Sequence, residues 1–130
     1  MNYLGIDLGG TNIVAAVVNE KYEIVSEVKN PTLCPRPWEE ILDDVAKTAI
    51  EAANLANLKI SDFAFVGIGS PGVISVETGT VIVAVNLGFE NVPLTKYLSE
   101  KLGVPVILEN DANAAAFGEY KAGEAKNTSN

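Results

Sequence analysis

Histidine is absent from this 130-residue chain, and Cys34 is its only cysteine. A single cysteine forms no intrachain disulfide, and a chain without histidine lacks the usual zinc ligands and the commonest general base. Acid or base chemistry must therefore use carboxylates, lysine, tyrosine or Cys34. Since no activating base accompanies Cys34 in the sequence, a packed or surface thiol is favoured over a nucleophile.

Positive charge is also scarce, because 9 Lys and Arg stand against 17 Asp and Glu and give a net charge of −8. No basic run supplies the electrostatic footprint that nucleic acids require, so nucleic acid is not an expected partner. Apolar stretches stop short of the roughly 18 residues of a membrane span, and no signal peptide opens the chain. We therefore expect a cytoplasmic protein that binds neither nucleic acid nor membranes.

The residues that are present are typical of one folded domain. Hydrophobic residues make up 48% of the chain and charged residues 20%, which suits a globular protein with a core. Three antiparallel strands followed by helix, strand, helix, strand and helix predict an α/β fold with a mixed sheet. The expected strands after the first are 13–18, 22–28, 63–69, a hairpin of 73–76 with 80–84, and 104–108, and the expected helices are 38–56, one starting at Pro93 and ending at Gly103, and one after Asn110.

The turn between the first two strands carries a glycine pair. Gly9 and Gly10 allow positive φ and expose backbone N–H groups, as close approach to a phosphate requires, and Thr11 adds a hydroxyl. Asp7 ends the first strand, and a carboxylate beside a phosphate indicates Mg²⁺ or its water shell. The alternative is an ordinary hairpin turn, in which Asp7 and Asn12 serve only turn geometry.

A second glycine-rich stretch follows the next buried strand. Gly67, Gly69 and Gly72 have the spacing of the dinucleotide-binding fingerprint. That fingerprint needs a helix at this point, whereas Pro71 and the β-branched residues 73–76 predict another strand, so we reject this interpretation. We expect these glycines to bring a loop backbone close to a ligand.

Asn110 and Asp111 come directly after the last predicted strand, where a helix begins. Asp111 is either a helix N-cap or a general base that takes a proton from a substrate hydroxyl attacking a phosphoryl group. Asn110 is either a turn residue or a partner for a sugar hydroxyl. Because ligands of such sheets bind beyond the carboxyl ends of the strands, we expect Asp7, residues 70–72 and Asn110–Asp111 to converge there.

The chain resembles the N-terminal half of the ROK family of sugar kinases and repressors, which belongs to the actin, Hsp70 and hexokinase superfamily. The resemblance spans nearly the whole chain. Four motifs carry it in the family's order: Asp7 to Asn12, Gly69-Ser70-Pro71-Gly72, Asn86-Leu87 and Glu109 to Glu119. It implies a ribonuclease H-like domain of the actin type, with a mixed five-stranded sheet, three antiparallel leading strands, flanking helices and an extra β-hairpin.

The resemblance also implies roles for individual residues. Asp111 corresponds to the catalytic base, and Asp7 would lie near Mg²⁺. The sugar would contact Asn110, Asn86 and the backbone near Gly72, and the ATP phosphates would lie near Gly9, Gly10, Thr11 and Asn12.

Several features of the family are missing here. Family members are longer and carry a histidine, a cysteine-rich zinc site and a second domain that holds the adenosine. None of these occurs in residues 1–130, so we expect an N-terminal domain that is inactive by itself. Residues 86–89 also lack the tryptophan common in the family, which leaves the sugar preference open.

Three functions therefore remain as alternatives. The first is a domain of an ATP-dependent kinase for a hexose or an N-acetylhexosamine. The second is the sugar-sensing domain of a ROK repressor, although such repressors carry a DNA-binding segment before the first strand and only six residues precede Asp7. The third is a superfamily member that hydrolyses ATP to move domains, which Asn110–Asp111 argues against. The oligomeric state stays open, with a homodimer as one alternative.

Overall fold

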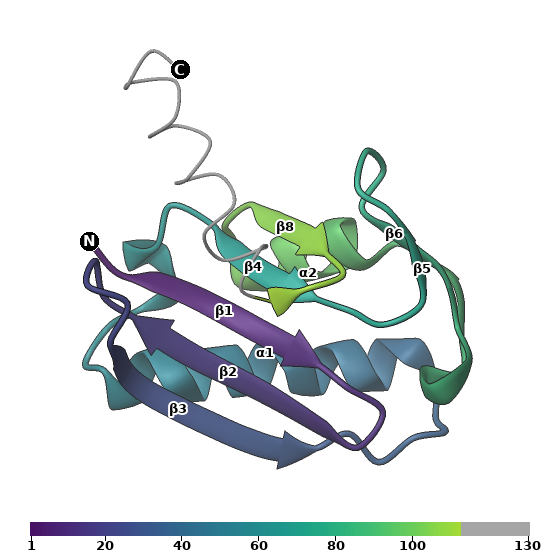
Figure 1. The fold of residues 1–130 in the computed structure, drawn as a ribbon, viewed down its shortest axis with the longest axis horizontal. Coiled ribbons are helices and arrows are strands. Elements are labelled where there is room, and N and C mark those ends of the chain that lie inside the picture. The colour runs from purple at the N-terminus through teal and green to yellow at the C-terminus, as the bar shows by residue number, and fades with distance from the viewer. Residues whose placement is uncertain (113–130) are drawn as a thin grey trace.

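The computed structural model describes residues 1–112, which form two β-sheets and two α-helices (Figure 1). The larger sheet has five strands in the order β3-β2-β1-β4-β8, and the smaller has the order β5-β6-β7. The strands are β1 (Tyr3–Leu8), β2 (Asn12–Val18), β3 (Ile24–Pro31), β4 (Val66–Gly69), β5 (Val73–Ser75), β6 (Thr80–Ala84), β7 (Phe89–Val92) and β8 (Val106–Glu109). The helices are α1 (Trp38–Leu55) and α2 (Leu94–Leu102), with short 3₁₀ helices at Ile60–Asp62 and Val85–Leu87. The expected mixed five-stranded sheet is confirmed.

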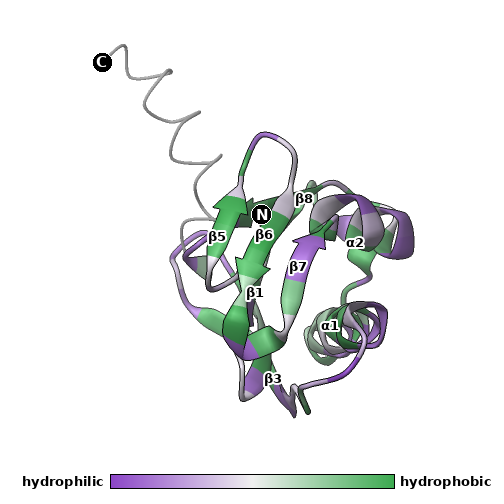
Figure 2. Cartoon of the chain, turned by 90° about the vertical axis from the view of Figure 1, so that its right-hand side faces the viewer, coloured by the Kyte–Doolittle hydropathy of each residue, from purple (hydrophilic) through white to green (hydrophobic). Residues whose placement is uncertain are grey.

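Both α-helices cover the same face of the five-stranded sheet, as Figures 1 and 2 show from two directions. Alternate residues of β1 and β2 point toward α1 and are buried, as the period of two along a strand requires. The apolar stripe of α1 meets them, which confirms the helix predicted over 38–56. The central core residues are Leu4, Ile6, Leu8, Ile13, Ala15, Val17, Ile41, Leu42, Val45 and Ala49.

Strand β4 lies between β1 and β8 and is parallel to both. All four of its residues are buried, which confirms the prediction of a strand covered on both faces. On the face away from α1, Tyr3 packs against Val18 and Phe65, with the two aromatic rings 6.5 Å apart. Because β1, β4 and β8 run in parallel, their carboxyl ends meet at one edge of the sheet.

Several strand boundaries differ from the predictions. The strand predicted over 22–28 ends at Pro31, and the strand predicted over 104–108 begins at Val106 and ends at Glu109. The third strand begins at Ile24 and not at Tyr22, because the Asn19 side chain accepts hydrogen bonds from the backbone N–H groups of Lys21 and Glu23 and prolongs the turn. Tyr22 has a φ of 63°, which is incompatible with a strand. The strand expected over 63–69 begins only at Val66.

Residues 86–89, where no helix or strand was predicted, are partly regular structure. A 3₁₀ turn ends at Gly88, whose φ is 69°, and Phe89–Val92 then pairs with β6. The extra hairpin is therefore a three-stranded sheet. In Figure 1 it lies at the end of the molecule toward which the arrow of β1 points.

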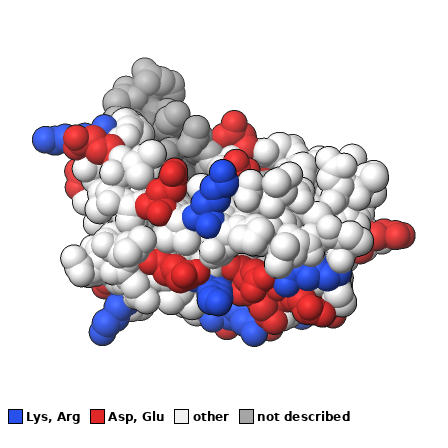
Figure 3. Space-filling model, turned by 90° about the horizontal axis from the view of Figure 1, so that it is seen from below, with Lys and Arg blue, Asp and Glu red and all other residues white. Residues whose placement is uncertain are grey.

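The helix expected after Asn110 lies outside the described residues, apart from Ala112. Within residues 1–112, no helix combines the length and hydrophobicity that spanning a membrane demands. On the face that Figure 3 shows, lysine and arginine side chains are interspersed with aspartate and glutamate and do not gather into a basic patch.

Candidate active site

The carboxyl ends of the three parallel strands form the edge at which the sequence motifs meet. Asp7 of β1 is in register with Gly69 of β4, and Gly69 with Glu109 of β8. Their side-chain positions all lie on the face away from α1, because the preceding residues Ile6, Ile68 and Leu108 are buried on the helix side. With strands about 4.8 Å apart, the backbones at Asp7 and Glu109 are about 10 Å apart, with Gly69 between them.

The glycine turn between β1 and β2 presents backbone donors at this edge. The turn closes on itself where the Gly9 N–H donates to the Asn12 carbonyl over 2.9 Å. The N–H groups of Gly10 and Thr11, by contrast, meet no hydrogen-bond acceptor within residues 1–112. Two adjacent N–H groups of this kind form the concave donor set that binds anions.

Asn86 lies against the glycine turn although it comes from the smaller sheet. A Cβ atom placed on Gly10 would be 3.2 Å from the Cβ of Asn86. The Asn86 side chain is exposed in the middle of the 3₁₀ helix Val85–Leu87, which follows β6. The structure therefore brings a residue expected at the sugar next to a residue expected at the phosphates.

Asn110 connects the end of β8 to the loop after β4. Its amide nitrogen donates to the carbonyls of Ser70, over 3.3 Å, and Gly72, over 3.1 Å. Since both partners are acceptors, they fix the orientation of the amide and use both of its N–H groups. The oxygen Oδ1 is therefore the atom of Asn110 that can serve a ligand, as an acceptor from a hydroxyl group.

Gly69 determines where Asp111 lies. A Cβ atom on Gly69 would be 2.8 Å from the Ala112 Cα and from the Asp111 carbonyl carbon, so the chain after β8 rests directly on Gly69. Asp111 is exposed at this point. Gly72 is similarly confined, because its φ is 91° and an added Cβ would be 2.9 Å from the Ala84 Cα. Asp111 and the loop 70–72 thus lie beside the same strand end.

Asp7 is a residue of this edge that could help to hold a metal ion. Residues 1–112 contain no cluster of three or more His, Cys, Asp or Glu side chains. Asp7 is an exposed single carboxylate near the glycine turn. Mg²⁺ is commonly held by one or two carboxylates together with substrate phosphates and water, which matches this arrangement.

The sequence analysis did not identify Thr32 and Cys34 as neighbours of the site. Thr32 is fully buried and its hydroxyl donates to the Gly9 carbonyl over 2.7 Å. The half-buried Cys34 thiol donates to the Gly10 carbonyl over 3.0 Å, where a packed or surface thiol was predicted. Both partners are more than 20 residues away in sequence, so no local pattern could reveal these contacts.

Known proteins with similar sequences include sugar kinases. The glucokinase of Streptomyces coelicolor is 42% identical over 123 residues, which cover 95% of this chain and 37% of the glucokinase. The N-acetyl-D-glucosamine kinase of Haemophilus influenzae is 36% identical over 118 residues, covering 90% of this chain and 37% of that kinase. The crystal structure of a ROK family glucokinase from Streptomyces griseus, in complex with glucose and AMPPNP, matches with a TM-score of 0.76 and 37% identity over 92% of this chain and 36% of that one.

A repressor is among the relatives as well. The xylose repressor of Caldicellulosiruptor bescii is 35% identical over 130 residues, covering 93% of this chain and 30% of the repressor. The chain therefore spans well under half the length of the relatives that it matches. The ROK family itself matches residues 3–130, and with the actin-like fold and four motifs in the same order, this chain belongs to the ROK family.

Proposed function

We propose that this chain is the N-terminal domain of an ATP-dependent kinase that phosphorylates a hexose or an N-acetylhexosamine. One observation carries the proposal: Asp111, which we assign as the base, lies beside Gly69 at the sheet edge that also bears Asp7 and the glycine turn. Similarity to a glucokinase and to an N-acetyl-D-glucosamine kinase supports this choice of substrate class.

In this proposal the sugar lies against the loop after β4. Asp111 accepts the proton of the sugar hydroxyl that attacks the γ-phosphoryl group, a contribution typically of about 10²- to 10⁴-fold. Oδ1 of Asn110 accepts a hydrogen bond from another hydroxyl, because the Asn110 amide N–H groups already bind the protein backbone. Asn86 and the Gly72 backbone complete the sugar side.

The nucleotide phosphates lie at the glycine turn, where the N–H groups of Gly10 and Thr11 bind their oxygens and Asn12 ends the turn. Mg²⁺, when bound near Asp7, neutralises negative charge on the transferred phosphoryl group. Asp7 holds this ion through its hydration shell. Because its proposed substrates are ATP and a small sugar, we expect a cytoplasmic protein.

Asp111→Asn in the full-length protein tests the assigned base. The amide keeps the shape of the carboxylate but accepts no proton, so kcat for sugar phosphorylation should fall by about 10²- to 10⁴-fold. ADP release is measured with glucose and with N-acetylglucosamine, and sugar affinity is measured by calorimetry. Asp62→Asn is the matched control, since Asp62 is an exposed aspartate at the end of the 3₁₀ helix Ile60–Asp62 and accepts a hydrogen bond from the Lys59 backbone N–H.

The proposal requires that Asp111→Asn loses turnover while it still binds sugar, and that Asp62→Asn keeps both. Unchanged turnover in Asp111→Asn would exclude Asp111 as the base. The chain 1–130 alone should not phosphorylate glucose, because it provides only one side of the nucleotide site. Phosphorylation by that chain would contradict this part of the proposal.

The similarity to a xylose repressor favours one second candidate, a sugar-sensing domain without required catalysis. A sensor should bind sugar, transfer no phosphate from ATP, and keep its sugar response when Asp111 is replaced by alanine. The wild-type phosphorylation assay therefore separates the two candidates.

A further inference from the structure

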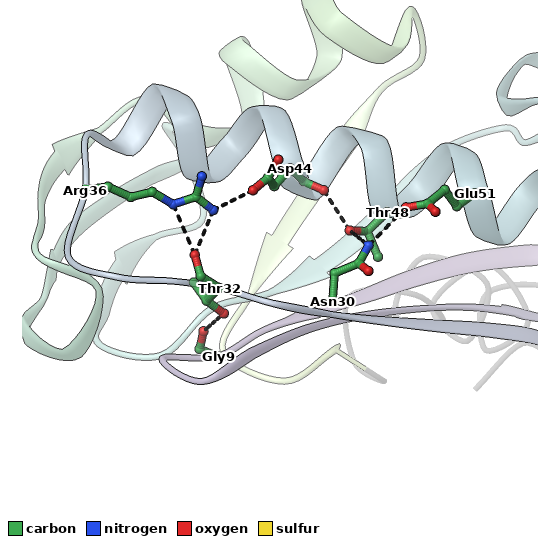
Figure 4. Close-up of polar contacts among 7 residues, drawn as sticks. All are labelled: Gly9, Asn30, Thr32, Arg36, Asp44, Thr48 and Glu51. Atoms are coloured by element: carbon green, nitrogen blue, oxygen red, sulfur yellow. Dashed lines mark hydrogen bonds and ion pairs between the residues drawn. The ribbon is translucent and has the colours of Figure 1, made fainter.

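The segment of residues 32–36, here called the clamp segment, connects β3 to α1 and contacts the glycine turn from behind (Figure 4). We propose that Thr32 and Cys34 of this segment are positioning residues of the nucleotide site: they hold the carbonyl groups of the turn so that its N–H groups face the phosphates. This inference rests on the proposed kinase function.

Three consecutive carbonyl groups of the turn accept hydrogen bonds from the clamp segment. The Thr32 hydroxyl donates to the Gly9 carbonyl over 2.7 Å, and the Thr32 backbone N–H donates to the Thr11 carbonyl over 2.9 Å. Between them, the Cys34 thiol donates to the Gly10 carbonyl over 3.0 Å. The turn is therefore held at every one of its peptide groups from Gly9 to Thr11.

The geometry of the peptide bond means that these carbonyl contacts set the direction of the N–H groups in the turn. In a trans peptide the carbonyl and the following N–H point in opposite directions. When Thr32 holds the Gly9 carbonyl, the Gly10 N–H must point away from the clamp segment, and the Cys34 contact does the same for the Thr11 N–H. These are the two N–H groups that lack an acceptor within residues 1–112. The donors are thus preorganised before a phosphate arrives.

The clamp segment is itself anchored to α1. The Thr32 carbonyl accepts two hydrogen bonds from the guanidinium of Arg36, at 2.7 and 3.1 Å. Arg36 also pairs with Asp44 on α1 at 2.5 Å. Figure 4 shows these contacts on one side of the helix, with Asn30 joining Thr48 and Glu51 further along it. Thr32 is also fully buried, so the surrounding packing as well as these hydrogen bonds holds it in place.

Cys34 contacts the sugar side as well. Its thiol lies 3.2 Å from the Asn86 carbonyl in addition to its contact with Gly10. A thiol has one proton, so Cys34 shares it between the two carbonyls. The thiol therefore fixes the distance between the proposed phosphate turn and the proposed sugar loop, whereas Thr32 acts on the phosphate turn alone.

Thr32→Val in the full-length protein tests the positioning role. Valine keeps the shape of threonine and the backbone N–H, but removes the hydroxyl that holds Gly9. Since a neutral hydrogen bond contributes about 0.5–1.5 kcal/mol, kcat/KM for ATP should fall about 2- to 10-fold, while the KM for sugar stays unchanged. Thr32→Ser restores the hydroxyl and should restore kcat/KM for ATP, which a purely steric role of Thr32 does not predict.

Ser26→Ala is the matched control for stability. Ser26 is buried in β3 and donates to the Ala52 carbonyl of α1 over 2.6 Å. This variant therefore loses one buried hydroxyl bond, as Thr32→Val does, but loses it between β3 and α1, away from the turn. It should lower the melting temperature and leave both KM values unchanged. If Thr32→Val does not fold, Cys34→Ala carries the test, and it should raise the KM values for ATP and for sugar together.

The outcomes separate this inference from the proposed function. If the wild type is active and the KM and kcat values of Thr32→Val and Cys34→Ala equal those of Ser26→Ala, the positioning role is overturned and the kinase proposal stays intact. A wild type that phosphorylates no sugar overturns the kinase proposal and, with it, the positioning role. A selective loss in kcat/KM for ATP that Thr32→Ser reverses supports both.

Discussion

Replacing Gly69 by alanine should displace the proposed base Asp111 while leaving its carboxylate unchanged. The added Cβ would be 2.8 Å from the Ala112 Cα and from the Asp111 carbonyl carbon, whereas ordinary contacts begin at 3.4 Å. Both neighbours are backbone atoms, which cannot rotate aside as a flexible side chain does. The backbone nitrogen of Ala112 would be closer still, so the chain that follows β8 must move to make room for the methyl group.

Such a displacement has different costs for activity and for stability. Moving a catalytic group by about 1 Å lowers rates by about 10²-fold, so kcat of Gly69→Ala should fall by roughly 10- to 100-fold. Inserting one methyl group into a packed site destabilises by about 1–3 kcal/mol. Because the φ of Gly69 is not in the left-handed region, backbone strain adds nothing further.

The assay compares Gly69→Ala with Gly103→Ala in the full-length protein. Gly103 ends α2 with a φ of 75° and open space around it, so alanine there costs about 1–2 kcal/mol through backbone conformation alone. Both variants should melt earlier than the wild type, and only Gly69→Ala should lose turnover. If Gly69→Ala kept its kcat and its melting temperature, the placement of Asp111 against β4 would be wrong.

Two further predictions concern polar contacts. Asn110→Asp sets a carboxylate against the carbonyls of Ser70 and Gly72, so sugar KM should rise at least about 10-fold in steady-state kinetics, and an unchanged KM would contradict the role given to Oδ1. On α1, hydrogen bonds from Tyr97 and then Lys101 lower the pKa of Asp43 below 3.8, and the Asp43 hydrogen bond raises the pKa of Tyr97 above 10.0. The lowered pKa of the Asp43 carboxyl stabilises the fold above pH 3.8, and the raised pKa of the Tyr97 phenol stabilises it below pH 10. The melting temperatures of Tyr97→Phe and the wild type should therefore differ most between these limits and converge as the pH falls through the lowered pKa of Asp43. A difference that persists in strong acid would exclude this hydrogen bond as its cause.

Much of the fold could be predicted because local patterns decide it. The alternation of apolar residues in β1 and β2 and the apolar stripe of α1 predict which face of each element is buried, and the structure buries these faces. Strand β7 was not predicted, because it is four residues long and its hydrogen-bonded neighbour in the smaller sheet is β6. The start of β3 was misplaced because an asparagine side chain, and not backbone pairing, controls the turn before it.

The site was predictable to the extent that its residues follow strands directly. Asp7, Gly69 and Asn110 stand at strand ends, and parallel topology alone places those ends together. What the sequence could not supply is the support behind them. The contacts of Thr32 and Cys34 with the glycine turn join segments that are far apart in sequence. The hydrogen bonds that the Asn110 amide N–H groups donate depend on where two carbonyl groups point.

The register Asp7–Gly69–Glu109 also determines where this domain tolerates changes in chain length. Deleting one residue within β4 or β8 reverses the side chains of that strand, which turns core residues such as Ile68 or Leu108 toward the ligand edge. Such a deletion damages the core and the site together. The exposed tip between β5 and β6 at residues 76–78 carries no such coupling. Insertions should therefore accumulate at that tip in natural variants, while the spacing within the parallel strands stays constant.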